Sequence, residues 1–244
     1  MSRLDPRLLL QGYATGIFPM ADSRAANELF WVEPKNRAII PIDGFHVSRS
    51  LRRTLRSGKF NVTHDRDFAG VIAACADREE TWINAELERA MLALHGSGHA
   101  HSIEVWLDQK LVGGLYGVKL GRAFFGESMF SRETDASQVA LAWRVGRLKV
   151  GNFTLLDCQF MTEHLASLGA ITVSRETYVA LLATALGGGA AAGAGAVVLP
   201  GAAAVTPDAP PDFVALDRLL ELAGAAGAGG PAGYVIAQLL GHTS

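Results

Sequence analysis

Hydrophobic residues recur with two different periods along residues 60–186, one typical of helices and the other of strands. Three β-prone runs follow one another closely, and the connections between them are short enough for antiparallel hairpins. We expect strands at 101–107, 111–118, 123–130, 153–160 and 170–173, and helices at 68–75, 84–95, 136–150, 162–168 and 176–186. This order predicts an α+β fold with a mainly antiparallel central sheet flanked by helices.

The strand expected at 153–160 carries two polar residues inside an apolar run. Side chains alternate between the two faces of a strand, so Asp157 and Gln159 point to one face and Cys158 to the other. A buried polar group without a partner costs roughly 1–3 kcal/mol, so both side chains need hydrogen-bond partners or a function. Cys158 is a poor candidate nucleophile because it faces away from them and has no neighbouring base.

Glu127 lies among aromatic and apolar residues in the stretch FFGESMF, residues 124–130. Such surroundings raise the pKa of a carboxylate unless a partner stabilises its charge. Glu127 is therefore a candidate functional acid, and a buried structural ion pair is the alternative. The glycines of the preceding strand (Gly113, Gly114 and Gly117) indicate a bulge or a close approach of backbone to a ligand.

The segment 48–59 holds five basic residues and no acid. On a helix, one face would carry Arg49, Arg52, Arg53 and Arg56, and the other Leu51 and Leu55. A solvated surface helix explains this pattern, but arginine forks also match RNA phosphates. Trp82 follows a charged loop, where an exposed indole could stack on a base, although a core tryptophan fits as well.

His95, His99 and His101 imitate the spacing of a metal site, but no Cys or carboxylate stands at ligand spacing. We therefore expect no metal ion. The net charge of −2 hides an asymmetry, because residues 1–60 carry ten Lys and Arg against five Asp and Glu. An excess of positive charge in residues 1–60 is typical of a protein that binds one anionic partner at one end. Two cysteines, and a start without a signal-peptide layout, predict the cytoplasm.

From residue 186 the chain becomes rich in Ala, Gly and Pro. We divide the chain into a small N-terminal domain (1–36), a catalytic domain (37–185) and a tail (186–244). The tail is expected to be a flexible linker with one or two short docking segments, of which 213–222 has helical apolar spacing. A dispensable appendage is the alternative.

Eight short segments occur in unbroken order between about residue 8 and residue 185. They are Tyr13-x2-Gly16-x-Phe18-Pro19-Met20, His46-Val47-Ser48-Arg49-Ser50, Thr81-Trp82-Ile83, His101-Ser102-x-Glu104-Val105-Trp106, Leu111-Val112-Gly113-Gly114-x-Tyr116-Gly117-Val118, Gly126-Glu127-Ser128-Met129-Phe130-Ser131, Asp157-Cys158-Gln159 and Ser167-Leu168-Gly169-Ala170. Together these segments resemble the bacterial leucyl/phenylalanyl-tRNA–protein transferase family. Their order makes the resemblance far more specific than any single motif.

The resemblance implies an enzyme that moves Leu or Phe, and less well Met, from tRNA onto proteins whose N-terminal residue is Arg or Lys. The product is thereby marked for degradation. It also implies a GCN5-like N-acetyltransferase-type catalytic domain, no cofactor, and a monomer that needs no membrane. The implied catalytic residues are Asp157, Gln159 and Glu127, the side-chain pocket is Leu115, Phe124, Met129 and Leu156, and the terminal adenosine lies against Trp82 and Met20.

The sequence departs from the family pattern in three places. The family usually has more sequence before the Tyr13 segment, so the N-terminal domain is expected to be truncated. Gln138 replaces a family lysine that helps with tRNA, and the Ala/Gly tail has no counterpart in shorter members. None of these changes touches the three implied catalytic residues.

Two other functions compete with the transferase. An acetyl-CoA-dependent N-acetyltransferase needs a glycine turn for pyrophosphate after the strand at 123–130, but Glu133 and Asp135 stand at that junction. A non-catalytic RNA-binding protein would explain the basic helix and Trp82. It would have no use for an acid and an amide aligned on a buried strand.

Overall fold

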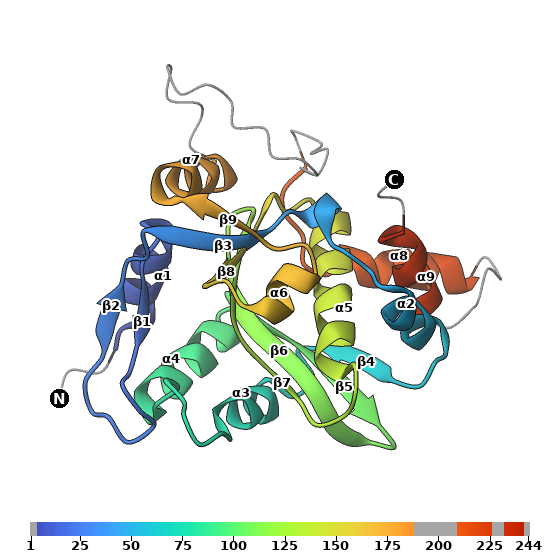
Figure 1. Ribbon diagram of the computed structural model, residues 1–244, viewed down its shortest axis with the longest axis horizontal. Coiled ribbons are helices and arrows are strands. Elements are labelled where there is room, and N and C mark those ends of the chain that lie inside the picture. The colour runs from blue at the N-terminus through green and yellow to red at the C-terminus, as the bar shows by residue number, and fades with distance from the viewer. Residues whose placement is uncertain (1–3, 188–208, 226–231, 242–244) are drawn as a thin grey trace.

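A seven-stranded sheet forms the centre of the molecule in the computed structural model, which describes residues 4–187, 209–225 and 232–241 (Figure 1). The strand order is β4-β5-β6-β7-β8-β3-β9. The strands are β3 (Asn36–Ile40), β4 (Asn61–His64), β5 (Ala100–Leu107), β6 (Lys110–Leu120), β7 (Ala123–Ser131), β8 (Leu155–Gln159) and β9 (Ile171–Ser174). All neighbours pair antiparallel except β7 and β8. The predicted α+β class and the mainly antiparallel sheet are confirmed.

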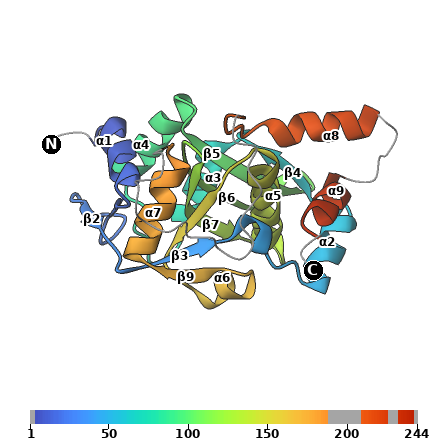
Figure 2. The ribbon, with the colours of Figure 1, turned by 90° about the horizontal axis from the view of Figure 1, so that it is seen from above.

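Helices cover both faces of this sheet (Figure 1, Figure 2). One face packs against α1 (Pro6–Ala14), α3 (Phe68–Ala76), α4 (Ala85–Gly96) and α7 (Arg175–Ala185). The other face packs against α2 (Arg49–Arg56), α5 (Ala136–Val150), α6 (Glu163–Ser167) and the short η1 (Ile42–Gly44). A small hairpin of β1 (Phe18–Met20) and β2 (Phe30–Val32) lies beside α1. The helices predicted in the middle of the chain are confirmed within a few residues.

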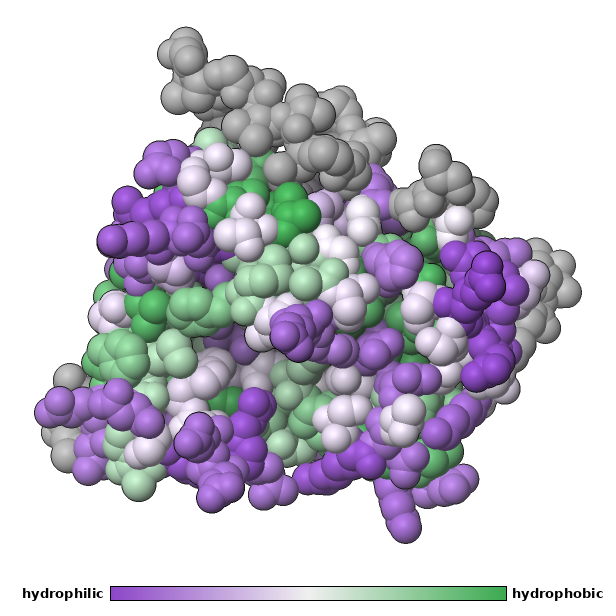
Figure 3. Space-filling model, viewed as in Figure 1, coloured by the Kyte–Doolittle hydropathy of each residue, from purple (hydrophilic) through white to green (hydrophobic). Residues whose placement is uncertain are grey.

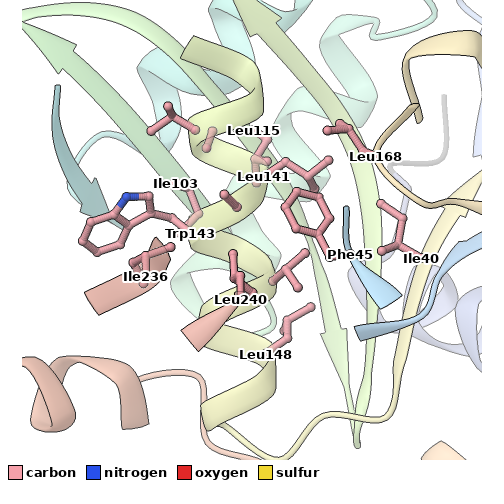
Figure 4. Packing of buried hydrophobic residues seen from close by; sticks show 14 of the residues in the cluster. Ile40, Phe45, Ile103, Leu115, Leu141, Trp143, Leu148, Leu168, Ile236 and Leu240 are labelled. Carbon is pink, nitrogen blue, oxygen red and sulfur yellow. The ribbon is translucent and has the colours of Figure 1, made fainter. Parts of the chain in front are cut away.

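Helix α5 is the most enclosed helix of the described chain. The sequence suggests an amphipathic helix here, but eleven of its fifteen residues are buried. Its inner side packs on β5, β6 and β7, while α2 and two C-terminal helices cover its outer side (Figure 4). Two of its buried residues are arginines, Arg144 and Arg147, so a helix that looks half-exposed in sequence carries two cations into the core.

The tail contributes these two outer helices, α8 (Ala215–Ala225) and α9 (Ala232–Leu239). Helix α8 confirms the helical segment expected at 213–222. Phe213 and Leu216 are buried against α5, and Ile236 of α9 is fully buried in the same cluster. These two helices are therefore part of the hydrophobic core and not an appendage. The linker expected from residue 186 to the start of α8 falls mostly at 188–208, outside the described residues.

Strands β7 and β8 separate after three paired positions. Ala123, Phe124 and Phe125 pair in parallel with Leu155, Leu156 and Asp157, and the pairing then ends. At the same level β7 bulges, because Tyr116 and Gly117 of β6 face Ser128 and Gly126, which leaves Glu127 as an extra residue. A Cβ on Gly117 would lie 2.2 Å from the Phe125 carbonyl oxygen, so the bulge requires glycine there. The split strands create a place for side chains between them.

Candidate functional site

Asp157, on β8, is held by a buried ion pair that was not predicted from the sequence. Arg37 of β3 donates from Nε and Nη2 to both carboxylate oxygens at 2.6–3.1 Å. The Tyr178 hydroxyl donates to Oδ2 at 2.8 Å, and the Gln159 backbone N–H donates to Oδ1 at 2.8 Å. Arg37 and Asp157 are both buried, so each charge is compensated mainly by the other.

The Arg37 guanidinium is enclosed by aromatic rings as well as by the carboxylate. Its Cζ lies 4.6 Å from the ring centres of Phe18 and Tyr178, and Nη1 donates to the Gly16 carbonyl at 3.1 Å. Burial alone would lower the Arg37 pKa, but the hydrogen bonds and charge of Asp157 outweigh it and raise the pKa. Arg37 therefore stays charged and ties the N-terminal segment to β8.

Glu127 projects from the β7 bulge toward Tyr13 of α1 and the Gln159 side chain. Its Oε1 accepts hydrogen bonds from the Tyr13 hydroxyl and from Gln159 Nε2, both at 2.9 Å. Its Oε2 is buried and has no hydrogen-bond partner among the described residues. Burial raises the pKa of Glu127 to about 8, and the charge of Asp157 adds to the rise, while the Tyr13 and Gln159 hydrogen bonds and Arg37 oppose it.

Gln159 joins the two acids. Its backbone has a φ of 63°, and the β3–β8 register shifts beside it, so the residue turns away from regular strand geometry. Its backbone N–H bonds to Asp157 and its side-chain amide bonds to Glu127. The amide oxygen Oε1 receives no hydrogen bond from the described residues, which leaves it available as an acceptor. The side chains of Asp157 and Gln159 both join this network, but the irregular backbone at Gln159, and not simple alternation, places the amide.

The three side chains are close together but barely exposed. The exposed fractions are 8% for Glu127, 6% for Gln159 and 0% for Asp157. Figure 3 shows a hollow in this face of the molecule, between the β1–β2 hairpin and the separated ends of β7 and β8. Glu127 and Gln159 are thus slightly accessible to solvent, and Asp157 is fully enclosed.

Sequence reasoning missed three residues of this network: Arg37, Tyr13 and Tyr178. Arg37 stands in the apolar run NRAII, residues 36–40, and a cation in such a run indicates a buried anion elsewhere. Tyr13 belongs to a recognised motif, but nothing local links it to Glu127, 114 residues away. Tyr178 lies on a helix whose apolar spacing hides its hydroxyl. Only the fold brings these residues together.

The implied side-chain pocket residues gather on the α5 side of the sheet. Leu115, Phe124 and Leu156 are fully buried there, and Met129 is partly buried against the same cluster (Figure 4 labels Leu115). Asp157 faces the opposite side, with Tyr13 and Tyr178. The structure therefore brings the four apolar residues together on one face of the sheet, while Asp157 and its partners lie on the other face.

The residues implied in tRNA binding fall into two separate groups. Met20 and Trp82 are partly buried against the cluster that contains Tyr13, and the Ala21 N–H donates to the Trp82 carbonyl at 3.3 Å. The arginines of α2 lie at the other end of the molecule (Figure 1, Figure 2). Arg49, Arg52, Arg53 and Arg56 line a shallow surface cavity of about 430 Å³, while Leu51 and Leu55 are buried as predicted.

The histidines and cysteines take structural positions. His101 Nδ1 lies 2.6 Å from Asp65 Oδ2, and His95 Nδ1 lies 3.8 Å from Asp65 Oδ1. In the part of the chain that the structure describes, no group of three or more His, Cys, Asp or Glu residues could hold a metal ion. Burial raises the pKa of the Cys158 thiol to about 12, which makes it a poor nucleophile. No described helix combines the length and apolarity needed to cross a membrane.

Comparison with known proteins identifies the kind of enzyme to which this chain belongs. A family model described as Leucyl/phenylalanyl-tRNA protein transferase matches residues 39–183, and the model of its N-terminal domain matches residues 2–35. Proteins named leucyl/phenylalanyl-tRNA–protein transferase are similar to the chain. One from Rhizorhabdus wittichii is 58% identical over the full length of both chains. One from Zymomonas mobilis is 62% identical over 75% of this chain and 70% of its own length.

A third relative of the same name, from Novosphingobium aromaticivorans, is 51% identical over the full length of both chains. Together with the fold and its paired acid and amide, these matches define the protein as an aminoacyltransferase. The chain belongs to the leucyl/phenylalanyl-tRNA protein transferase family.

Proposed function

We propose that the enzyme transfers Leu or Phe, and less well Met, from aminoacyl-tRNA to the α-amine of proteins with N-terminal Arg or Lys. The modified proteins would then enter a degradation route. The observation that carries this proposal is the geometry of Gln159, whose amide nitrogen is held by Glu127 while its carbonyl oxygen receives no hydrogen bond from the described residues. The acceptor amine needs such a fixed hydrogen-bond acceptor.

The chemistry is a direct aminolysis of the ester. The amine nitrogen attacks the ester carbonyl carbon, the C–N bond forms, and the C–O bond to the ribose breaks. The amine proton leaves with the ribose hydroxyl. An α-amine has a pKa of about 8, so a useful fraction is neutral near pH 7. Positioning can supply much of the acceleration, up to roughly 7–11 kcal/mol. Neither a covalent intermediate nor a strong base is required.

The structure refines the roles that the residues would play. Glu127 accepts a hydrogen bond from the Gln159 side-chain amide, whereas Asp157 accepts one from the Gln159 backbone N–H. Gln159 Oε1 would accept the amine hydrogen. Asp157, fixed by Arg37, would keep the strand end in place and stabilise the positive charge on the attacking nitrogen.

Glu127 would bind the cationic acceptor. Its free Oε2 and its raised pKa mean that it is largely protonated at neutral pH before the acceptor arrives. An approaching ammonium or guanidinium group favours the ionised carboxylate, so binding would release the proton. Acceptor binding should therefore strengthen as the pH rises toward 8.

The tRNA would approach along the basic end of the molecule. Its terminal adenosine would lie against Met20 and Trp82, and Arg49, Arg52, Arg53 and Arg56 would contact phosphates. The transferred side chain would enter beside Met129, toward Leu115, Phe124 and Leu156. An aliphatic, aromatic and thioether lining suits Leu, Phe and Met. We place this activity in the cytoplasm and in a monomer, with no cofactor.

The parallel β7–β8 pair that separates at a bulge supports a GCN5-like N-acetyltransferase-type fold for residues 37–185, behind a small N-terminal domain of residues 1–36. Acetyl-CoA is a poor second candidate as substrate. Asp135 stands at the N-cap position of α5 in a left-handed conformation, and its carboxylate accepts a hydrogen bond from Thr54 and not from the helix. This acid occupies the helix N-terminus where a pyrophosphate would need backbone donors.

One assay tests the proposal. The protein is incubated with labelled Leu-tRNA and a peptide with N-terminal Arg, with the N-acetylated peptide as the matched control. Label should appear on the free peptide alone. Transfer to both peptides, or to neither, would refute the aminolysis. A parallel reaction with labelled acetyl-CoA should give no product, and acetylation would favour the second candidate.

A further inference from the structure

Arg144 of α5 is a buried cation without an acceptor. It is 2% exposed, its Nε has no hydrogen-bond partner, and no ion pair joins it to any described residue. Arg147, one turn further along the same helix, is equally buried but donates to Asp217 and to the Phe213 carbonyl. The Nε of Arg147 is also without a partner, so the two arginines differ in that only Arg147 has a carboxylate counterion and bonded Nη groups.

The Arg144 guanidinium lies at the split between β7 and β8. Its Cζ is 5.5 Å from the centre of the Phe124 ring. Its Nη1 is 2.9 Å from the point where a Cβ on Gly126 would stand, so the group touches the strand directly before Glu127. It also lies close enough to Cys158 to interact with it electrostatically. These neighbours belong to the apolar side of the split, where the transferred side chain would enter.

The surroundings of Arg144 cannot neutralise it. Burial lowers its pKa to about 10, so the guanidinium is still charged at neutral pH. The Cys158 thiol, with a pKa of about 12, stays neutral and is a weak acceptor. A guanidinium can also be stabilised by the face of an aromatic ring. A ligand that brings a ring into the split would therefore add a second aromatic face to the one that Phe124 supplies.

We propose that Arg144 forms one wall of the side-chain pocket and makes the enzyme favour phenylalanine over leucine as the transferred residue. This inference rests on the proposed function. A phenylalanine ring can lie over the guanidinium and attract it, in the way that Phe124 already does. A leucine side chain offers only C–H groups and leaves the buried N–H donors without partners. The sequence suggests a purely apolar pocket, whereas Arg144 gives the pocket one charged wall.

A competition assay tests this role. Phe-tRNA and Leu-tRNA are supplied together with the N-terminal Arg peptide, and the product ratio gives the ratio of kcat/KM values. Arg144→Met and Arg144→Gln, which both remove the charge, should lower the Phe-to-Leu ratio by roughly 2- to 30-fold. Arg144→Lys keeps a cation and should retain most of the wild-type ratio.

Arg147→Met is the matched control. It should lower the thermal stability of the protein and leave the Phe-to-Leu ratio unchanged, since Arg147 contacts α8 and not the split. An unchanged ratio in either folded neutral variant of Arg144 would overturn the inference and make Arg144 a hydrated structural residue. A wild-type enzyme that transfers neither amino acid would instead refute the proposed function itself.

Discussion

The Asp157 carboxylate and the Arg37 guanidinium lie in the interior, where neither charge would be tolerated alone. Tyr178 and the Gln159 backbone complete the bonding of the carboxylate. Two functions meet in this arrangement, because the same pair supports the protein fold and fixes the strand end that presents Gln159. Substitutions here must therefore be judged on stability and on activity together.

Asp157→Asn should reduce both properties. It removes the negative charge and leaves Arg37 buried without a counterion, which costs about 3–5 kcal/mol of unfolding free energy. Transfer should fall far more than tRNA binding does. Tyr178→Phe is the matched control, since it removes one hydrogen bond to the same carboxylate and should cost only about 1 kcal/mol. Chemical denaturation and a transfer assay on the folded fraction measure the two effects, and equal losses of stability in both variants would contradict the explanation.

Glu127 makes stability depend on pH in the direction opposite to an ion-paired acid. Its pKa is raised to about 8, so the folded protein keeps a proton that the unfolded chain loses near its ordinary pKa of about 4.3. The contribution of Glu127 to the free energy of unfolding is therefore largest below a pH of about 4.3. It falls as the pH rises from there to about 8, by at most about 1.4 kcal/mol per pH unit.

Glu127→Gln should remove this slope, because the amide oxygen can still accept from Tyr13 and Gln159 but cannot ionise. Denaturation of wild type and variant across pH 5–8 gives the difference. The variant should gain stability relative to wild type with increasing pH. Parallel curves would mean that Glu127 is ionised throughout this range.

The residues that sequence reasoning identified are those with a local signal. Asp157 and Gln159 interrupt an apolar strand, and Glu127 stands among aromatic residues. Their partners have weaker signals, because Arg37 is separated from Asp157 by 120 residues and Tyr13 from Glu127 by 114. Periodicity describes a segment and its faces. It contains no information about which distant segment lies opposite.

The same limit applies to whole elements. The central meander, the basic helix α2 and the helices around them follow from spacing, and the structure confirms them. Strands β3 and β4 and the β1–β2 hairpin are short, and their sequence patterns do not predict them. The burial of α5 could not be read from its own sequence either, because it depends on α8 and α9, which follow a long Ala/Gly/Pro-rich stretch.

Helix α8 is fixed by an ion pair with Arg147 as well as by its hydrophobic packing. The Asp217 carboxylate accepts two hydrogen bonds from this guanidinium, at 2.6 and 2.7 Å. Asp217→Asn should destabilise the protein by about 1–3 kcal/mol, because a buried cation loses its charged partner. Glu221→Gln, a matching change on the exposed side of the same helix, should have little effect. Thermal unfolding of both variants provides the comparison, and equal melting temperatures would show that α8 does not depend on the ion pair.

At the scale of the whole molecule, the basic helix α2 and the polar network of Glu127 lie at different ends (Figure 1). A ligand that contacts both must be long, which a tRNA is. The cationic face of α2 is exposed at Arg49, Arg53 and Arg56, and α9 packs along the same helix. This separation allows phosphate binding to be altered without disturbing the site.

Reversal of charge at Arg52 and Arg53 should raise the Kd for tRNA and flatten its dependence on salt, by about one unit of slope per lost phosphate contact. Transfer at saturating tRNA should change little. Reversal of Arg89 and Lys110, two exposed cations on other elements, makes the same change in net charge and serves as the control. Equal effects of the two double variants would indicate general electrostatics and not a specific face.

The hydroxyl of Tyr178 and the guanidinium of Arg37 meet at one carboxylate, although the chain between them holds most of the sheet. A ribosome releases these segments in order, so the site stays incomplete until α7 has emerged from the exit tunnel. Charged tRNAs surround every translating ribosome. A nascent chain that lacks α7 therefore meets these tRNAs with a site that is not yet fully assembled.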